Sequence, residues 1–523
     1  MFGLPTLRRY TTEFVPAICN NPPCGDIVAL ANPLVELTGN HFTLGVATSK
    51  IHILGWGSLG YNTGYAGVAG ISGDYRRTRP TAGNIKRAID PVLKIPEMSD
   101  IIKVSCNTSV TFLLTEKGYL YASGNDVGGI TGNGNKNEFT LVEDNVINYD
   151  LASNARYGGY CYILILKKDG KVYGKGINYG GFGVSGNLAS TTYLGIDNVK
   201  AVFCNMPENI GKSFALKTDG TVWATGYNTD GVLGIGGTNF GLVNTWNQVK
   251  KSDGTNLTNI KHIITSNWVE AGGANEGDGT WGGGGGNSHQ TTIFLSEDGK
   301  VYSTGNNKFG QLGLGLATNV TKNTANQITT LTNIKKIASC CGGTSFLAYD
   351  GSKIYTWGNN DFYQLGSNDN VDKNAPYDCG SFLDDGEIIL NINGGGPHNI
   401  INGAFVMNTN FGNVYSAGYN STYALGFEGQ SRIKTFTKHP YFGPDPSERI
   451  TDYNDKPENY SERALIFDLD LCGYGTEMAQ KAINKEGILF MSGWNQNVDG
   501  TYNFNQNIGT QYVKVPAIFK LTT

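Results

Sequence analysis

The chain has 523 residues, of which only 16% are charged, and it carries a formal net charge of −4. This balance excludes bulk electrostatic attraction to nucleic acid or to an anionic membrane as the basis of its function. No apolar run approaches the roughly 18 residues of a membrane span, and the first ten residues lack the apolar core of a signal peptide. With 73 glycines, the composition is that of a turn-dense all-β chain.

One short phrase, a tight turn followed by a strand and then Gly-x-Asn, recurs eight times along the chain, and its first copy is the most eroded. In chain order the copies occupy residues 48–57, 117–125, 169–178, 219–228, 298–307, 350–360, 411–420 and 486–495. Self-similarity at a period of roughly 50 residues is typical of a propeller, a solenoid or an array.

Each copy is predicted to contain one β-hairpin. An Asp-Gly or similar pair supplies a tight turn that needs a positive φ, and the residues after it alternate as in a strand. A second glycine follows the first by six residues, as in Gly220 and Gly226, whereas Gly351 and Gly358 are seven apart. The extra residue predicts a bulge or a longer turn in that copy.

Two further elements complete each unit. A third glycine recurs eight residues after the second, usually behind a leucine, and a short apolar strand precedes each hairpin, for example at 260–264 and 334–337. The unit is therefore predicted to be a four-stranded antiparallel blade. Blades of this size arranged radially form a β-propeller, which leaves only short, protected strand edges.

The complete pattern resembles the regulator-of-chromosome-condensation repeat family. Its parts are an apolar strand, Ser or His, a second apolar strand, Asp-Gly, apolar-x-x-Gly-x-Asn and Gly-Gln-Leu-Gly, and residues 305–313 are the closest copy. The resemblance implies an all-β fold with a single β-propeller of seven four-stranded antiparallel blades, and eight blades are the alternative. Either all eight copies form blades, or the eroded first copy joins the terminal segments to close the ring.

This interpretation divides the chain into three parts. Residues 1–39 are expected to form an N-terminal arm and ring-closing strands, 40–500 the propeller repeats, and 501–523 a C-terminal closing segment. The repeats are interrupted by insertions near 72–100, 271–287 and 439–463. Because blades are scaffold, specificity is expected in such insertions.

Two of the insertions supply candidate binding residues. The first concentrates five basic side chains that could contact a carboxylate-rich or phosphate-bearing partner, or could form a plain solvated loop: Arg76, Arg77, Arg79, Lys86 and Arg87. The second combines an aromatic anchor with a dense glycine run, which suits either a sugar- or protein-binding tip or a flexible excursion: Trp281, Gly282, Gly284 and Gly286. The third insertion, rich in proline and acidic residues, is interpreted as an exposed polar loop.

Sites that could carry chemistry are few. The Gly211-Lys212-Ser213 run lacks the first glycine of a phosphate-binding loop, because position 206 is Met206. An alignment of Lys212 with Thr344 in another copy assigns the run to the repeat instead. The Asp369–Asp372 stretch is interpreted as a turn, with a loosely held cation as the alternative. We predict no catalytic residues, no metal site and no cofactor, and hence no enzyme.

Histidines and cysteines are also interpreted structurally. His41 and His289 stand before hairpins, where a hydrogen-bonded role is expected. The nine cysteines show no zinc-like spacing, so reduced thiols are expected, and a bridge between Cys19 and Cys24 is the alternative.

We interpret the chain as a structural or adhesion protein that uses the propeller as a platform for protein or glycan contacts. The abundance of Gly, Asn, Thr and Tyr points to a divergent bacteriophage or viral member, a tail, fibre or capsid-attached component of the virion made in the host cytoplasm. The expected partners are neighbouring virion proteins or a host surface protein or glycan, and nucleic acid is not among them. The chain is expected to have no membrane span, and a homo-oligomeric assembly is left open.

Two alternatives stay open for the function, and a cytoplasmic location goes with them. One is a regulator resembling the guanine-nucleotide exchange factors of the same repeat family, although their exchange residues do not map onto matching positions here and no basic tail is present. The other is a propeller-type enzyme inhibitor, which would bind its target enzyme tightly in a one-to-one complex.

Overall fold

The computed structural model describes residues 101–439 with gaps at 107–109, 133, 154–160, 207–209, 267–288, 319, 341–342, 396–402, 421–423 and 428. It also describes the backbone of the strands at 35–38, 42–47, 52–57, 466–474, 477–484, 488–493 and 513–518. In these residues every regular element is a strand, apart from two short 3₁₀ turns, η2 (Val127–Gly129) and η3 (Thr229–Gly231). No helix among them is long and apolar enough to cross a bilayer.

The strands form eight antiparallel sheets, called blades 1 to 8 in chain order. Blade 1 has three strands: β1 (Val35–Thr38), β2 (Phe42–Ala47) and β3 (His52–Gly57). Blade 2 contains β4 (Ile101–Cys106), β5 (Val110–Thr115), β6 (Leu120–Gly124) and β7 (Lys136–Glu143). Blade 3 contains β8 (Val146–Ser153), β9 (Cys161–Lys167), β10 (Val172–Gly176) and β11 (Leu188–Tyr193). Blade 4 contains β12 (Val199–Asn205), β13 (Lys212–Lys217), β14 (Val222–Tyr227) and β15 (Leu242–Gln248).

The remaining blades follow the same plan. Blade 5 contains β16 (Ile260–Thr265), β17 (Thr291–Ser296), β18 (Val301–Gly305) and β19 (Lys322–Gln327). Blade 6 contains β20 (Lys336–Cys340), β21 (Ser345–Tyr349), β22 (Ile354–Gly358) and β23 (Lys373–Asp378). Blade 7 contains β24 (Ile389–Gly395), β25 (Ala404–Thr409), β26 (Val414–Tyr419) and β27 (Arg432–Lys438). Blade 8 contains β28 (Ile466–Tyr474), β29 (Glu477–Asn484), β30 (Ile488–Gly493) and β31 (Val513–Ile518).

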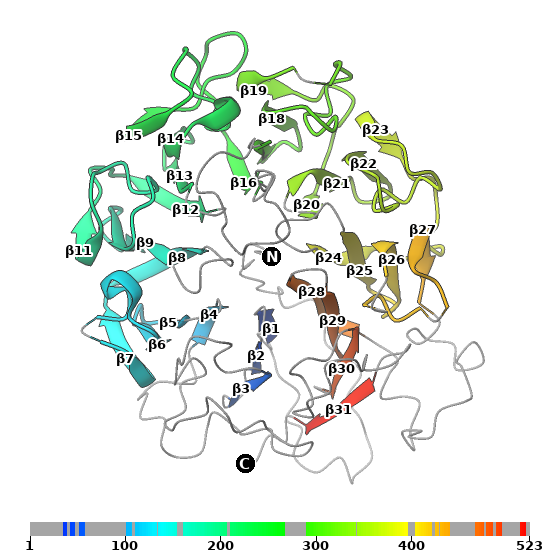
Figure 1. Ribbon diagram of the computed structural model, residues 1–523, viewed down its shortest axis with the longest axis horizontal. Coiled ribbons are helices and arrows are strands. Elements are labelled where there is room, and N and C mark those ends of the chain that lie inside the picture. The colour runs from blue at the N-terminus through cyan, green and yellow to red at the C-terminus, as the bar shows by residue number, and fades with distance from the viewer. Residues whose placement is uncertain are drawn as a thin grey trace, which may run out of the picture.

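The blades are arranged in a ring (Figure 1). Within each blade the strands pair in sequence order, with the first strand nearest the centre and the last at the rim (Figure 1). Strand β1 contacts both β4 and β28, so blade 1 closes the ring between blades 2 and 8. The all-β propeller predicted from the repeat is confirmed, with seven four-stranded blades and one three-stranded blade among the described strands. The eroded first copy provides β3 of that smaller blade, whereas β31 near the C-terminus completes blade 8.

Two details of the predicted hairpins are wrong. The strand expected at 334–337 begins later, at Lys336, because the N–H of Ile334 bonds to the carbonyl of Gly299 in blade 5. The turn after Tyr349 is shorter than its counterparts, not longer. Four residues separate the last paired residues Tyr349 and Ile354, whereas five separate Leu216 and Val222 in blade 4.

The hydrophobic cores of the described blades lie between neighbouring sheets. The second strands supply them with continuous buried runs, as in Val110–Thr115. Between blades 5 and 6, for example, Trp357 is fully buried against Ile328 and Ile334 of the preceding blade and stacks on Phe346 with ring centroids 5.7 Å apart. Each blade therefore depends on its neighbours for its core, as in other repeat architectures.

The second glycine marks a bulge in six of the eight copies, those of blades 2 to 7. Gly226 has φ +116°, and the pairing of β14 with β15 shifts register between Ala224 and Gly226. A Cβ at Gly226 would lie 2.7 Å from the Cα of Lys212 on the paired strand. The same register shift and a positive φ recur at five further glycines: Gly124, Gly176, Gly305, Gly358 and Gly418. Only glycine meets both demands.

We predict that Gly226→Ala lowers the free energy of unfolding by about 3 kcal/mol, because the new methyl group meets the backbone of β13 in a strained conformation. Gly237 has φ +74° but nothing within 4 Å of its Cβ position, so it serves as the control for the conformation alone. Gly237→Ala is expected to cost only about 1 kcal/mol. Chemical denaturation of both variants measures the difference, and equal losses would contradict the steric explanation.

Candidate functional site

The loop between the third and fourth strands of a blade, here called its outer loop, is organised by the asparagine of Gly-x-Asn. In blade 6 the Oδ1 atom of Asn360 accepts the N–H of Leu365 at 3.0 Å, and its Nδ2 donates to the carbonyl of Asp369 at 2.6 Å and to Ser367 Oγ at 2.9 Å. Comparable pairs of bonds are made by Asn178, Asn228, Asn307 and Asn420. The repeated asparagine therefore has a structural role, since it satisfies loop backbone groups that the strands do not pair.

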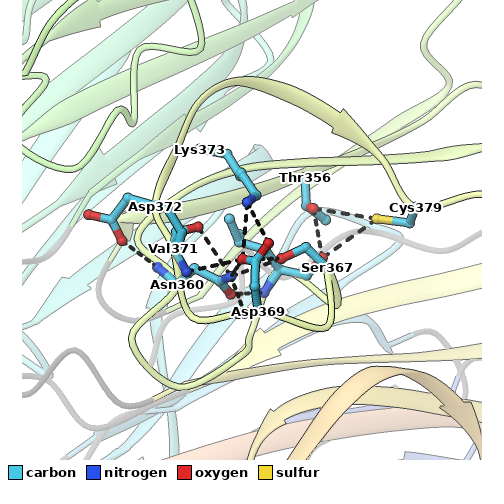
Figure 2. A network of polar contacts seen from close by, with 9 residues as sticks. Thr356, Asn360, Ser367, Asp369, Val371, Asp372, Lys373 and Cys379 are labelled. Atoms are coloured by element: carbon cyan, nitrogen blue, oxygen red, sulfur yellow. Dashed lines mark hydrogen bonds and ion pairs between the residues drawn. The ribbon is translucent and has the colours of Figure 1, made fainter.

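Acidic residues complete the polar network of the blade 6 loop (Figure 2). Asp369 accepts the N–H of Val371 at 3.0 Å and forms an ion pair of 2.8 Å with Lys373. Asp372 accepts the backbone N–H of Asn360 at 2.8 Å. Burial raises the pKa of the Asp372 carboxyl to about 6, and the charge of Asp361 adds to this effect.

This arrangement bears on the chemistry expected of the loop. Lys373 neutralises Asp369, which favours the turn interpretation of the Asp369–Asp372 stretch over a cation site. In the described part of the chain, no three His, Cys, Asp or Glu side chains converge as metal ligands. Cys379 lies beside Thr356 Oγ1 at 3.4 Å (Figure 2), and burial raises the pKa of its thiol to about 12, so it is protonated at neutral pH.

A left-handed glycine occupies one position of the outer loop in blades 2, 4 and 5. It stands three residues before the third glycine of the copy, as Gly129, Gly231 and Gly310, with φ between +74° and +80°. A Cβ at Gly129, Gly231 or Gly310 would lie 2.6 Å from a Cα atom of the next blade's outermost strand. The loop of one blade approaches the rim strand of the next so closely that a side chain does not fit.

Blades 6 and 7 depart from this pattern, because the sequence has Tyr363 and Tyr423 at this position, and Tyr423 lies outside the described residues. Tyr363 occupies the glycine position, three residues before Gly366, and keeps the left-handed conformation with φ +64°. A bulky residue there stores roughly 1 kcal/mol or more of backbone strain. The outer loop of blade 6 still meets the rim strand of blade 7. The N–H of Asn368 donates to the carbonyl of Lys434 at 3.0 Å. The outer loop of blade 5 meets blade 6 in the same way, through a bond from the N–H of Gly315 to the carbonyl of Asn374.

Tyr363 belongs to a group of aromatic and cationic side chains at the seam of blades 6 and 7. We call this group the aromatic–cation cluster: Phe362, Tyr363, Tyr419, Arg432 and Lys434. The guanidinium of Arg432 lies 5.0 Å from the Phe362 ring centroid, and Lys434 Nζ lies 5.3 Å from that of Tyr363. Tyr419 packs edge-on against Phe362 with centroids 5.1 Å apart.

The charges of the cluster are uncompensated. Arg432 and Lys434 are exposed and form no ion pair with any carboxylate in the described residues. Other lysines of the same two blades are neutralised, as Lys353 is by Asp378 at 2.6 Å and Lys438 by Asp384 at 2.8 Å. Among the described residues these two cations have no carboxylate partner and rest on half-buried aromatic rings, which makes this seam the best candidate for recognition of a partner.

The candidate binding residues predicted from the sequence lie elsewhere. Arg76, Arg77, Arg79, Lys86, Arg87, Trp281, Gly282, Gly284 and Gly286 all fall outside the described residues, so their roles stay predictions. The sequence reasoning missed the aromatic–cation cluster. Its signal was a tyrosine at position 363 where the closest copy has Gly310 in an otherwise similar Gln-Leu-Gly context.

The Gly211-Lys212-Ser213 run is part of blade 4. Lys212 is fully buried, and its Nζ donates to the carbonyl of Ser266 at 3.0 Å and to Gln290 Oε1 at 2.5 Å, both in blade 5. Burial lowers its pKa to about 7, against the opposing charge of Asp230. Lys212 pairs with Gly226 as Ser345 pairs with Gly358, so the predicted alignment with Thr344 is wrong by one residue. The shorter turn of blade 6 causes this offset.

Of the two histidines that stand before hairpins, one lies in the described residues. His289 is buried at 8% exposure, its Nε2 lies 2.9 Å from Lys308 Nζ, and its ring packs edge-on against Phe309. These contacts agree with a structural role. His41, Cys19 and Cys24 fall outside the described residues, whereas Cys161, Cys204, Cys340 and Cys379 are not in disulfide bonds.

Comparison with known proteins adds a family to this geometry. Residues 285–311 and 352–401 match models described as the Regulator of chromosome condensation (RCC1) repeat. Two segments of the chain therefore match the RCC1 repeat. The second matched segment includes Phe362 and Tyr363, so these two residues of the cluster lie inside a recognised repeat, whereas Tyr419 lies beyond it.

Several known proteins share these RCC1 repeats in part. The chain is 23% identical to the human Regulator of chromosome condensation over 333 residues, 59% of this chain and 71% of that protein. It is 25% identical to the Ultraviolet-B receptor UVR8 of Arabidopsis thaliana over 53% of this chain and 57% of that protein. Among solved structures, human WBSCR16 is 16% identical with a TM-score of 0.48, covering 78% of this chain and 93% of that one. Saccharomyces cerevisiae Prp20p, described with its binding to Gsp1p and histones, is 17% identical with a TM-score of 0.47, covering 68% and 79%.

We predict that Asp372→Asn stabilises the protein at neutral pH. The folded-state pKa of about 6 exceeds the ordinary value of 3.8, so the folded chain holds the proton more tightly and its unfolding free energy falls as pH rises from about 4 to 6. Asparagine keeps an acceptor for the Asn360 N–H without the charge. Because the group is partly exposed, the expected gain at pH 7.5 is only about 1 kcal/mol, vanishing below about pH 4.

Denaturant unfolding across this pH range measures the effect of Asp372→Asn. Asp369→Asn is the matched control with the opposite sign. Although burial opposes the shift, hydrogen bonds from Lys373 and Val371 lower the pKa of Asp369, so its ionised form is stabilising. The control is expected to lose stability at neutral pH, and a parallel response of both variants would contradict the assignment.

Proposed function

We propose that this propeller is a non-enzymatic platform for protein–protein interaction and that the partner contacts the aromatic–cation cluster. Tyrosine and arginine are the residue types enriched at energetic hot spots of protein interfaces, and they contribute most where aromatic rings are already held in place. Phe362 is held in this way between Tyr419 and Arg432, with its neighbour Tyr363 on the same outer loop.

The observation that carries the proposal is the conformation of Tyr363. Glycine occupies the equivalent position in blades 2, 4 and 5, where a Cβ would meet the next blade, whereas the sequence has Tyr423 there in blade 7. A residue that costs backbone strain and leaves its ring half-exposed gains nothing evident for the fold. Strained residues of this kind concentrate where a protein meets its ligand.

The narrower hypothesis is a structural or adhesion component of a bacteriophage or viral particle, contacting neighbouring virion proteins or a host glycan. It rests on the composition of the chain and extends the platform proposal to the virion, with the cytoplasm as the alternative location. Detection of the chain in purified native particles is its expected outcome, and detection only as a soluble cellular monomer contradicts it.

A regulator of nucleotide exchange is a second candidate, favoured by the RCC1 repeats themselves. In this case the platform would bind a small GTPase and accelerate release of its bound nucleotide. A fluorescent-nucleotide release assay with small GTPases separates the candidates, because a purely structural platform leaves the release rate unchanged. Tight one-to-one inhibition of an enzyme would identify the third candidate, an inhibitor.

Site-specific photo-cross-linking tests the platform proposal. A photo-reactive amino acid at Ser431, which is exposed and precedes Arg432, is expected to form one discrete adduct with a partner in extracts of the source organism. The same group at Leu141, 53% exposed on the rim of blade 2, is the control and is expected to give no such adduct. The partner identified by mass spectrometry is then purified and titrated against wild type and Arg432→Gln/Lys434→Gln. Identical adducts from both positions, or unchanged affinity of the double variant, would contradict the proposal.

A further inference from the structure

We propose, building on the platform function above, that the aromatic–cation cluster binds a short, extended, acidic segment of the partner protein in which two carboxylates stand two residues apart. The partner chemistry follows from the spacing of the cations, from their preorganisation on aromatic rings and from the sign of the charges around them.

The spacing of the two cations matches an extended peptide. Arg432 and Lys434 are two residues apart on the rim strand β27, so their side chains leave the same face with Cα atoms about 6.5 Å apart. Carboxylates at positions i and i+2 of an extended segment have the same separation. Each cation can therefore meet one carboxylate, and the residue between the carboxylates points the other way.

The aromatic rings hold the cations in place before the partner arrives. Arg432 lies over Phe362 and Lys434 over Tyr363, and each contact contributes roughly 0.5 to 1 kcal/mol at an exposed site. Tyr419 fixes the Phe362 ring from the side. Side chains already ordered in the free protein lose less conformational entropy on binding, which makes the ion pairs with a ligand more favourable.

The surrounding charges favour a short acidic segment over a long polyanion such as a nucleic acid. Asp361 directly precedes Phe362 and is exposed, whereas Asp369 and Asp378 of the same blade are paired with Lys373 and Lys353. The chain as a whole has a net charge of −4. A polyanion would bring its further charges towards the exposed Asp361 carboxylate and the net negative charge of the chain, whereas a two-carboxylate motif meets Arg432 and Lys434 alone.

Binding of defined peptides tests this inference. The probes are short fluorescent peptides with two glutamates flanking a leucine, isomers of equal composition with the glutamates three residues apart, and a short oligothymidine. Fluorescence anisotropy is measured for wild type, for Arg432→Gln/Lys434→Gln, and for the control Lys200→Gln/Lys335→Gln. The control removes the same number of charges from two other exposed lysines.

Wild type is expected to bind the first peptide at least about fivefold more tightly than its isomer, a difference near 1 kcal/mol, and less tightly as salt rises from about 50 to about 200 mM. The cluster variant is expected to lose this preference while the control keeps it. Circular dichroism and thermal unfolding establish that both variants are folded.

Three outcomes would overturn the inference: no binding of the acidic peptides, equal weakening in both double variants, or tighter binding of the oligothymidine. None of these outcomes affects the cross-linking test, because a partner that cross-links at Ser431 without an acidic segment leaves the platform proposal standing. Loss of the cross-link itself overturns the proposed function and, with it, the assignment of a partner to the cluster.

Discussion

The approach of each outer loop to the rim strand of the next blade is the constraint on which the ring depends. At Gly129, Gly231 and Gly310 a Cβ would lie 2.6 Å from a backbone Cα of the neighbouring blade. This contact sets how closely the described blades pack at the rim, just as the apolar clusters between neighbouring sheets set how they pack inside. A left-handed glycine satisfies it because glycine alone combines a positive φ with the absence of a side chain.

The outer loops can meet this constraint because each is held by a polar side chain at its base. A buried asparagine bonds to the backbone on both sides of the loop in blades 4, 5, 6 and 7, for example Asn307 and Asn420. In blade 2, Asp126 takes the same place and accepts N–H groups of Thr131, Gly132 and Gly134. The blade 6 loop has the same support, so Phe362 and Tyr363 project from a rigid base. A rigid base lets a binding site carry local strain without loosening the ring.

The repeat made the architecture predictable from the sequence, because hairpin turns, bulges and loop ends all need glycine at fixed spacing. The alternation of Val222, Trp223 and Ala224 likewise places β14 correctly. The glycine spacing could not reveal the turn of blade 6. A separation of seven residues between Gly351 and Gly358, in place of six, is compatible with a longer or a shorter turn. Only the pairing of Tyr349 with Ile354 decides between them. The buried lysine at 212 was recognised as part of the repeat, but its bonds to Ser266 and Gln290 join segments that no local pattern connects.

The aromatic–cation cluster was harder to predict, because it joins a loop of one blade to a strand of the next. The tyrosine at 363 is visible as a departure from glycine, which Tyr423 shares in the next copy, yet its meaning depends on φ and on the approach of β27, which the sequence does not display. The insertions drew attention because they interrupt the pattern. The cluster instead includes a substituted position, 363, that lies within the repeat pattern.

The direct test of this account is to place glycine at position 363, as at Gly310 in blade 5, and to measure stability and binding in the same preparation. Tyr363→Gly removes the strain of a tyrosine at φ +64° and is expected to raise the free energy of unfolding by about 1 kcal/mol. It also removes a ring of the cluster, so affinity for the cross-linked partner is expected to fall about tenfold. Gly310→Tyr, the reciprocal change in blade 5, is expected to destabilise the protein. A Tyr363→Gly variant that loses stability, or that binds the partner as tightly as wild type, would contradict the account.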